Sequence, residues 1–282
     1  MYFHIEGSMY LFKLVQSALF FIGFINHNNP NIHNDNIHNT LSLAASSYCP
    51  PNEILSWSCK TCTNDVRNIS LIDDDTRIIM GYDKTMDSYF ISIRGSSDIN
   101  NWISNLETRI IHPYYDKDIG VHNGLYYEYL RYKDKMISFV TELNHSVNLI
   151  ITGHSSGGAL ASFLAYDLVT QGIFLYSNIH LYTFGSPRIG NKAFMKSFIS
   201  FDIPHNRITY KNDIVPHLPQ EILGFIHLPH EIWFSSANVS KICHDLDGKE
   251  DDSCSNSCSP FSCTSVDDHL NYLDSAIGSN AC

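Results

Sequence analysis

The sequence is poor in positive charge and has no long hydrophobic run. Its 18 Lys and Arg residues are outnumbered by 29 Asp and Glu residues, which gives a formal net charge of -11. Binding to nucleic-acid phosphates requires clustered cations, so this balance argues against a general nucleic-acid-binding protein. The most apolar stretch, Leu14–Ile25, is shorter than the roughly 20 residues that cross a bilayer, so no transmembrane segment is expected.

The N-terminal residues have the order expected of an export signal. Lys13 precedes the apolar run, and Met9 is a better start for such a signal than Met1. No small-x-small cleavage motif follows, so a buried hydrophobic helix stays open as the alternative. We assign residues 1–26 to a signal peptide and residues 27–47, rich in Asn and His, to a disordered linker or pro-segment. A secreted, extracellular protein is therefore expected.

The cysteines also favour export. There are eight, an even number, as expected of disulfides formed in an oxidising compartment. The alternative is zinc, because Cys59-Lys-Thr-Cys62 has metal-ligand spacing. A second Cys-x-x-Cys motif is missing, and Cys254, Cys258 and Cys263 are irregularly spaced. Disulfides are therefore favoured over zinc, and neither a metal nor a cofactor is expected.

From about residue 41 the chain alternates between strand-like and helix-like patterns. It predicts strands over Thr76–Tyr82, Ser88–Arg94, Val147–Thr152, Asn178–Phe184 and Arg207–Tyr210, with helices over Val121–Leu143 and Gly158–Gln171. Strands that alternate with helices imply an α/β fold with a mostly parallel central sheet and helices on both faces. No linker or repeat interrupts the pattern, so residues 48–282 are expected to form one domain.

The most informative motif is Gly-His-Ser-Ser-Gly at residues 153–157. A predicted strand runs into it and a predicted helix follows, which is the setting of a nucleophile elbow. Such a tight turn needs glycines on both flanks, and it presents the hydroxyl of Ser155 at the carboxyl end of the strand. The start of the helix favours developing negative charge. The motif therefore predicts that Ser155 is a catalytic nucleophile.

A serine nucleophile needs a histidine to accept its proton and a carboxylate to orient that histidine. In α/β-hydrolases the chain order is Ser, acid, His. Asp213 follows the last predicted strand, where such a carboxylate lies, and His269 comes later in the required order. The protein has 15 histidines, and His227 and His230 remain rivals to His269 on this reasoning.

The strand that ends at residue 94 leads to a Gly-Ser-Ser turn. Such a turn suits an oxyanion hole, to which Ser96 and Ser156 would each contribute a backbone N–H. An apolar stripe at i, i+3, i+4 and i+7 then predicts a short helix. Such a stripe usually packs in the core, and this alternative stays open; beside an oxyanion turn, the stripe is interpreted as a lid that covers the site in water and opens on lipid. Its members are Ile99, Trp102, Ile103 and Leu106.

Together these motifs resemble the fungal class 3 triacylglycerol lipases, from about residue 48 to residue 282. The shared motifs, in order, are Tyr-Cys-Pro at 48–50, Trp-Ser-Cys-Lys-Thr-Cys at 57–62, Arg-Gly-Ser-Ser at 94–97, Asn-Trp-Ile at 101–103, His-Asn-Gly at 122–124, the elbow, Tyr-Thr-Phe-Gly-Ser-Pro-Arg-Ile-Gly-Asn at 182–191, Asp-Ile-Val-Pro at 213–216, Gly-Phe-Ile-His at 224–227, Glu-Ile-Trp at 231–233 and Asp-His-Leu at 268–270.

The resemblance implies an α/β-hydrolase fold with a helical lid. It implies Ser155, Asp213 and His269 as the triad, with Ser96 and Ser156 as oxyanion donors, and it gives His227 a structural role. It also implies the disulfides Cys49–Cys282, Cys59–Cys62 and Cys243–Cys254, which leaves Cys258 and Cys263 for one more. One departure is Ser156, where the family usually has Leu; this makes the nearby pocket more polar.

The function expected from the sequence is a secreted, monomeric triacylglycerol lipase that acts at an oil–water or membrane interface. A phospholipase A1 and a feruloyl-type esterase share the fold and remain alternatives. A non-catalytic secreted lipid-binding protein is the alternative from another class. The triad candidates argue against it, because a binding module does not need them.

Overall fold

The computed structural model describes residues 30–245, 248–258 and 262–282. The predicted signal peptide, residues 1–26, lies outside the described residues. The chain divides into two compact units, residues 1–35 and residues 36–282. The sheet and all of the candidate site residues belong to the second unit.

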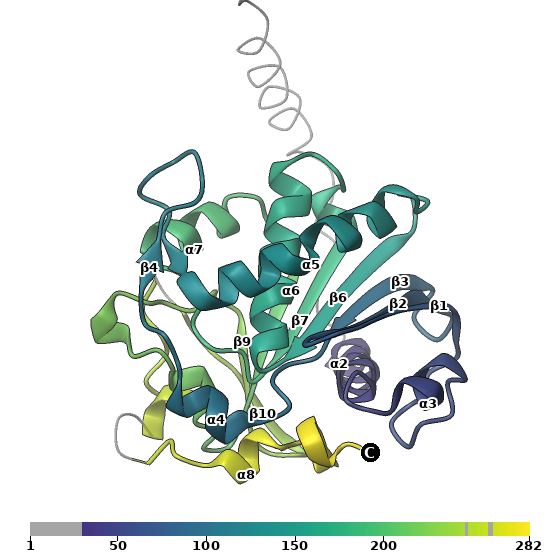
Figure 1. The fold of residues 1–282 in the computed structure, drawn as a ribbon. Coiled ribbons are helices and arrows are strands. Elements are labelled where there is room, and N and C mark those ends of the chain that lie inside the picture. Colours follow the sequence, from purple (N-terminus) through teal and green to yellow (C-terminus); the bar gives the residue numbers. More distant parts are fainter. Residues whose placement is uncertain (1–29, 246–247, 259–261) are drawn as a thin grey trace, which may run out of the picture. The chain divides into compact units, whose positions relative to one another are not determined.

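A mixed eight-stranded sheet, in the order β1-β2-β3-β6-β7-β8-β9-β10, forms the framework of the described residues (Figure 1). Its strands are β1 (Val66–Asp73), β2 (Arg77–Asp83), β3 (Ser88–Ile93), β6 (Asn148–His154), β7 (Ile179–Phe184), β8 (His205–Tyr210), β9 (Glu231–Ser236) and β10 (Val239–Ile242). Strands β3, β6, β7, β8 and β9 are parallel, and antiparallel pairs flank them at both edges. The predicted mostly parallel α/β sheet is confirmed.

Helices lie along and around this sheet. They are α2 (Pro30–Ser46), α3 (Pro51–Leu55), α4 (Ile99–Ser104), α5 (Asn123–Thr141), α6 (Ser156–Thr170), α7 (Lys192–Ile199) and α8 (Val266–His269). Short strand pairs join β4 (Ile110–Ile111) to β5 (Val121–His122) and β11 (Asn271–Tyr272) to β12 (Ser275–Ala276). The 3-10 turns are η1 (Tyr176–Asn178), η2 (Val215–His217), η3 (Glu221–Leu223), η4 (Ser255–Cys258) and η5 (Gly278–Asn280).

The core has two parts because neighbouring strand residues point to opposite faces of the sheet. On β3, Ile91 belongs to the cluster that contains the buried side chains of α5, α6 and α7. Its neighbour Phe90 belongs to the cluster that contains those of α2 and α3. The same alternation occurs on β6, between Ile151 and Ile150. Helices therefore cover both faces, as the sequence predicted.

The expectation of a disordered linker over residues 27–47 is wrong for its second half. Helix α2 runs to Ser46, and Ile37, Leu41, Ala44 and Ala45 are buried in the core. These apolar residues recur at i, i+4, i+7 and i+8, which is one face of a helix. The prediction of a linker relied on the abundant Asn and His residues around this stripe and so overlooked its helical spacing. The packed core thus begins before residue 48.

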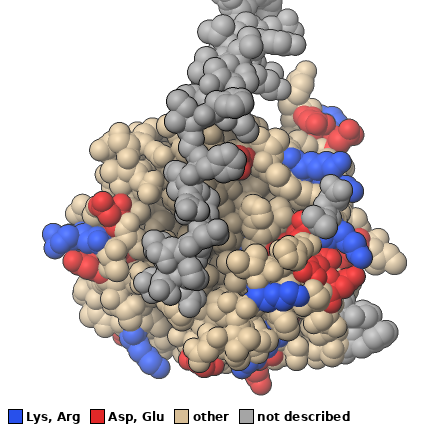
Figure 2. Space-filling view, turned by 180° about the vertical axis from the view of Figure 1, so that it is seen from behind, with Lys and Arg blue, Asp and Glu red and all other residues tan. Residues whose placement is uncertain are grey.

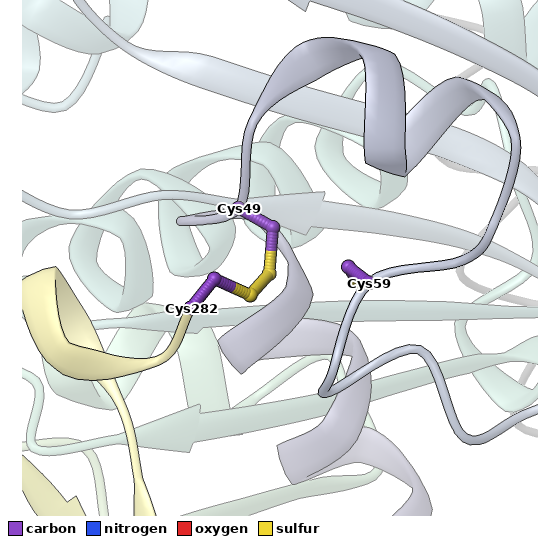
Figure 3. A group of neighbouring side chains, drawn as sticks. All are labelled: Cys49, Cys59 and Cys282. Carbon is purple, nitrogen blue, oxygen red and sulfur yellow. A yellow bond between two sulfur atoms is a disulfide. The ribbon is translucent and has the colours of Figure 1, made fainter.

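Four disulfides join all eight cysteines: Cys49–Cys282, Cys59–Cys62, Cys243–Cys254 and Cys258–Cys263. The first three are the pairs that the family resemblance implied, and the fourth joins the two cysteines that were left over. Figure 3 shows the bond from Cys49 to the C-terminal residue, with Cys59 close to it. Bonds of this kind persist in oxidising compartments, which agrees with an extracellular protein.

The surface of the described residues carries charges of both signs. On the face drawn in Figure 2, Lys and Arg side chains are interspersed with Asp and Glu and lie mainly towards the rim. Mixed charges of this kind do not produce a strong single-sign field on that face. Among the described residues, no helix combines the length and the apolar character needed to span a bilayer.

Candidate active site

Ser155 occupies a sharp turn between β6 and α6. Its backbone lies in the left-handed region, with φ 58° and ψ -133°. The turn requires glycine on both sides. A Cβ on Gly153 would lie 2.4 Å from the carbonyl carbon of Gly157, and one on Gly157 would lie 2.1 Å from the carbonyl oxygen of Ile93. The local geometry is therefore that of a nucleophile elbow, with the strained serine at its apex.

Asp213 and His269 meet at the carboxyl end of the parallel strands. Asp213 lies just beyond β8, and His269 is the last residue of α8. Nδ1 of His269 is 2.9 Å from Oδ2 and 3.0 Å from Oδ1 of Asp213, and both residues are buried. Because the carboxylate accepts the proton on Nδ1, Nε2 of the neutral ring is the basic nitrogen.

Two further donors fix the carboxylate of Asp213. The hydroxyl of Tyr272 donates to Oδ2 at 2.5 Å, and the backbone N–H of Val215 donates to Oδ1 at 2.8 Å. Burial, together with the negative charge of Asp213, raises the pKa of Tyr272 well above its ordinary value. The phenol therefore stays protonated and donates over the whole working range of pH.

The reactive atoms of Ser155 and His269 remain free of other protein partners. Oγ of Ser155 and Nε2 of His269 are both buried, and neither makes a hydrogen bond within the described residues. The ring of His154 packs against the ring of His269, with centroids 4.4 Å apart. Through this ring contact, the elbow packs against the segment of His269 one residue before Ser155.

A chain of hydrogen bonds links the three segments that build the site. The N–H of Gly95 donates to the hydroxyl of Tyr48 at 3.0 Å, and this hydroxyl lies 2.8 Å from Nδ1 of His154. Nε2 of His154 is 2.9 Å from the carbonyl oxygen of His269, which only accepts. His154 therefore donates through Nε2 and accepts from Tyr48 through Nδ1. Burial, reinforced by the adjacent His269, lowers the pKa of His154 well below its ordinary value and keeps it neutral.

The predicted oxyanion turn lies directly against the elbow. A Cβ on Gly95 would be 2.5 Å from the carbonyl oxygen of His154 and 2.7 Å from Cβ of Ser155. This contact places the following residue, Ser96, beside the nucleophile. Ser156 is the first residue of α6 and is buried. Both predicted donors therefore come from backbone segments that flank Ser155.

The predicted lid stripe is partly helical. Helix α4 begins after Asp98, whose carboxylate accepts the N–H of Asn101 at 3.0 Å as an N-cap. Ile99 is buried, and Trp102 packs against the core. Ile103 is half-buried, and Leu106 lies two residues beyond the end of the helix. The apolar side of this segment is thus partly covered, with Ile99 buried and Trp102, Ile103 and Leu106 partly exposed.

The rival histidines lie elsewhere. His227 is buried with Nε2 2.7 Å from the carbonyl oxygen of Pro216, which is a structural contact. His230 is exposed and stacks on His205, with ring centroids 4.5 Å apart. Of the three candidates, the geometry places only His269 on Asp213.

Sequence reasoning assigned no role to three residues that complete the site. His154 is part of the elbow motif and Tyr48 is part of the first shared motif, but neither motif indicated what these side chains do. Tyr272 is three residues beyond His269 and gave no signal of its own. Its function depends on the tertiary contact with Asp213.

Comparisons with known proteins agree with this geometry. Residues 90–222 match the family described as Lipase (class 3). The lipase of Rhizomucor miehei is 35% identical over 244 residues, which are 82% of this chain and 66% of the relative. The secreted mono- and diacylglycerol lipase A of Penicillium cyclopium is 30% identical over 60% of this chain and 55% of the relative. The chain thus spans between about half and two thirds of the length of these relatives.

A solved structure of a triacylglycerol lipase is similar over almost its whole length. It is described as having a serine protease triad as its catalytic centre. It superposes with a TM-score of 0.80 at 32% sequence identity, covering 89% of this chain and 97% of that one. On sequence and on structure, the chain belongs to the fungal class 3 lipase family and has the α/β-hydrolase fold.

Proposed function

We propose that this protein is a triacylglycerol lipase with Ser155, His269 and Asp213 as its catalytic triad. The observation that carries the proposal is the buried contact between Asp213 and His269, in a chain whose Ser155 has the geometry of a nucleophile elbow. A carboxylate held on Nδ1 fixes the tautomer in which Nε2 accepts a proton. A lipid-binding scaffold without catalysis would have no need of this arrangement.

The reaction runs in two acyl transfers. Nε2 of His269 takes the proton of Ser155 as its Oγ attacks the ester carbonyl. The tetrahedral intermediate collapses, the ester C–O bond breaks, and His269 gives the proton to the departing alcohol. Water then attacks the acyl-enzyme, again with His269 as the base, and releases the fatty acid. Asp213 stabilises the imidazolium that forms in each step.

The negative oxygen of each intermediate needs hydrogen-bond donors. The backbone N–H groups of Ser96 and Ser156 are the proposed pair, because both segments adjoin Ser155 and amides are pre-oriented for this task. The removal of one such donor typically lowers kcat by about 10²–10³-fold. Since these donors are backbone groups, a serine in place of leucine at residue 156 leaves them intact.

The proposed substrates are water-insoluble lipid esters. The support is the apolar side of the lid segment, with Trp102 and Ile103, which an interface would solvate once the segment moves. An enzyme for soluble esters gains nothing from such a surface. A phospholipase A1 and a feruloyl-type esterase are the alternatives that the substrate test separates from a triacylglycerol lipase.

We further propose that the protein is secreted and monomeric. The four disulfides and the secreted Penicillium relative support secretion.

The test compares three substrates at equal enzyme concentration: a triglyceride emulsion, a dissolved short-chain ester and a phospholipid dispersion. A lipase shows a jump in rate once the triglyceride exceeds its solubility and forms an interface. Equal or greater turnover of the dissolved ester, without that jump, contradicts the lipase proposal. Faster hydrolysis of phospholipid than of triglyceride favours the phospholipase. A Ser155→Ala protein, checked for folding, is the background control.

A further inference from the structure

The Cys258–Cys263 disulfide precedes the segment that carries His269. Only Thr264 separates Cys263 from Ser265, the residue at which this segment joins the Asp213 loop. The backbone N–H of Ser265 donates to the carbonyl oxygen of Asn212 at 3.0 Å, and its carbonyl oxygen accepts from Ile214 at 3.3 Å. The backbone of Ser265 is therefore hydrogen-bonded to the residues on both sides of Asp213.

The same residue also begins the helix of the catalytic histidine. Oγ of Ser265 accepts the N–H of Asp268 at 2.9 Å and caps α8, which ends at His269. The side chain of Asp268 in turn accepts the N–H of Asn212 at 3.2 Å. The relative position of Asp213 and His269 thus depends on where Ser265 is held.

The other cysteine, Cys258, ends the turn η4, whose first residue is hydrogen-bonded to the central sheet. Sγ of Cys258 lies 3.0 Å from the carbonyl oxygen of Ser255, a buried residue. The hydroxyl of Ser255 donates to the carboxylate of Glu231, a buried residue of β9. Sγ of Cys258 also lies 3.9 Å from Nε2 of His217, in the turn that follows Asp213.

We infer that the Cys258–Cys263 disulfide is a positioning element of the active site, which ties Ser265 to β9 and so holds His269 on Asp213. The bond offers a short covalent path to Ser265 from η4, the turn that is hydrogen-bonded to β9. Without it, the connection runs through the intervening chain, and Ser265 gains freedom to shift. Misplacement of a catalytic group by about 1 Å is enough to lower a rate by about 10²-fold. This inference rests on the proposed triad, and it names Cys258 and Cys263 as residues that position the triad without taking part in the reaction.

The test is the double variant Cys258→Ser/Cys263→Ser, compared with Cys59→Ser/Cys62→Ser as the matched control. Each removes one disulfide that closes a short loop, with sequence separations of 5 and 3. The control pair precedes β1, and its Cys59 lies next to the Cys49–Cys282 bond (Figure 3). We expect kcat on a dissolved ester to fall between about tenfold and a hundredfold in the first variant only, with KM within about twofold of the parent.

A second readout separates positioning from stability. A proton shared between His269 Nδ1 and a buried carboxylate gives a proton NMR resonance far downfield of the amide region. We expect this resonance to broaden or vanish in the Cys258→Ser/Cys263→Ser protein and to persist in the control. Unchanged kcat and an unchanged resonance in the first variant would overturn the inference, as would equal losses in both variants.

If the double variant does not fold, the folded parent replaces it. The parent is treated with a small dithiol and alkylated, and peptide masses report how much of Cys258 and Cys263 is blocked. Activity that falls in step with the blocking of this pair supports the inference, and full activity with both residues blocked contradicts it. If the untreated parent hydrolyses no ester, the proposed function fails, and the proton resonance alone decides the positioning role.

Discussion

Replacement of Tyr272 by phenylalanine should affect stability far more than catalysis. The change removes one hydroxyl that donates to Oδ2 of Asp213 at 2.5 Å. Hydrogen bonds to a charged group contribute roughly 1.5–3 kcal/mol, and this carboxylate is buried away from water. We therefore expect the free energy of unfolding to fall by about 2 kcal/mol.

The effect on kcat should be small because His269 keeps both of its contacts with the carboxylate. Val215 still holds Oδ1, so the orientation of Asp213 is largely preserved. We expect kcat of Tyr272→Phe to fall by less than about tenfold, whereas a carboxylate-to-amide change in a triad costs about 10⁴-fold. The measurements are urea unfolding followed by fluorescence and steady-state hydrolysis of a dissolved ester.

Tyr210→Phe provides a matched control. Its ring packs against Tyr272 with centroids 5.5 Å apart, and its hydroxyl donates at 2.9 Å to Asp274, an exposed residue. Because Asp274 is exposed, water can replace the lost hydroxyl as its partner, so this change should cost only about 1 kcal/mol. Parental stability in Tyr272→Phe, or a thousandfold loss of kcat, would refute the reasoning about Tyr272.

Two further changes test the buried charges and the buried histidines. Glu250→Gln breaks the buried ion pair with Arg188, in which both N–O distances are 2.7 Å. We expect the free energy of unfolding, measured in urea, to fall by about 3 kcal/mol, while kcat stays at the parental value. Burial, with His230 nearby, lowers the pKa of His205 from 6.5 to about 4, so the unfolded chain binds a proton that the folded one excludes. The free energy of unfolding should therefore fall as pH drops from 6.5 to 4, by about 3 kcal/mol from this residue, and a His205→Asn protein should show a correspondingly shallower loss in urea titrations across that range. Equal pH slopes in parent and variant would contradict the assignment to His205.

The sequence predicted the parts of the site that local patterns encode. Gly153 and Gly157 predict the elbow because the turn leaves no room for a side chain at either position. The alternation of strands and helices predicts the parallel sheet. The chain order Ser, acid, His left His227 and His230 as rivals to His269, and the family resemblance chose His269 among them. Local patterns succeed here because the backbone itself restricts which residues fit.

The rest depends on contacts between distant segments. Helix α2 was missed because its apolar stripe is interrupted by Asn and His, and its burial against the sheet overrides that composition. The link from Tyr48 to His154 spans 106 residues and has no local pattern. The support of Asp213 by Tyr272 spans 59 residues, and sequence spacing gives no reason to expect it.

Covalent labelling shows directly whether Ser155 is the nucleophile. A phosphonate ester that mimics the tetrahedral intermediate is incubated with the parent and with Ser155→Ala, and the labelled peptide is identified by mass spectrometry. The account predicts one label, located on Ser155, with loss of ester hydrolysis in proportion to labelling and no label on the folded variant. A label on another residue, or a Ser155→Ala protein that hydrolyses esters at the parental rate, would contradict it.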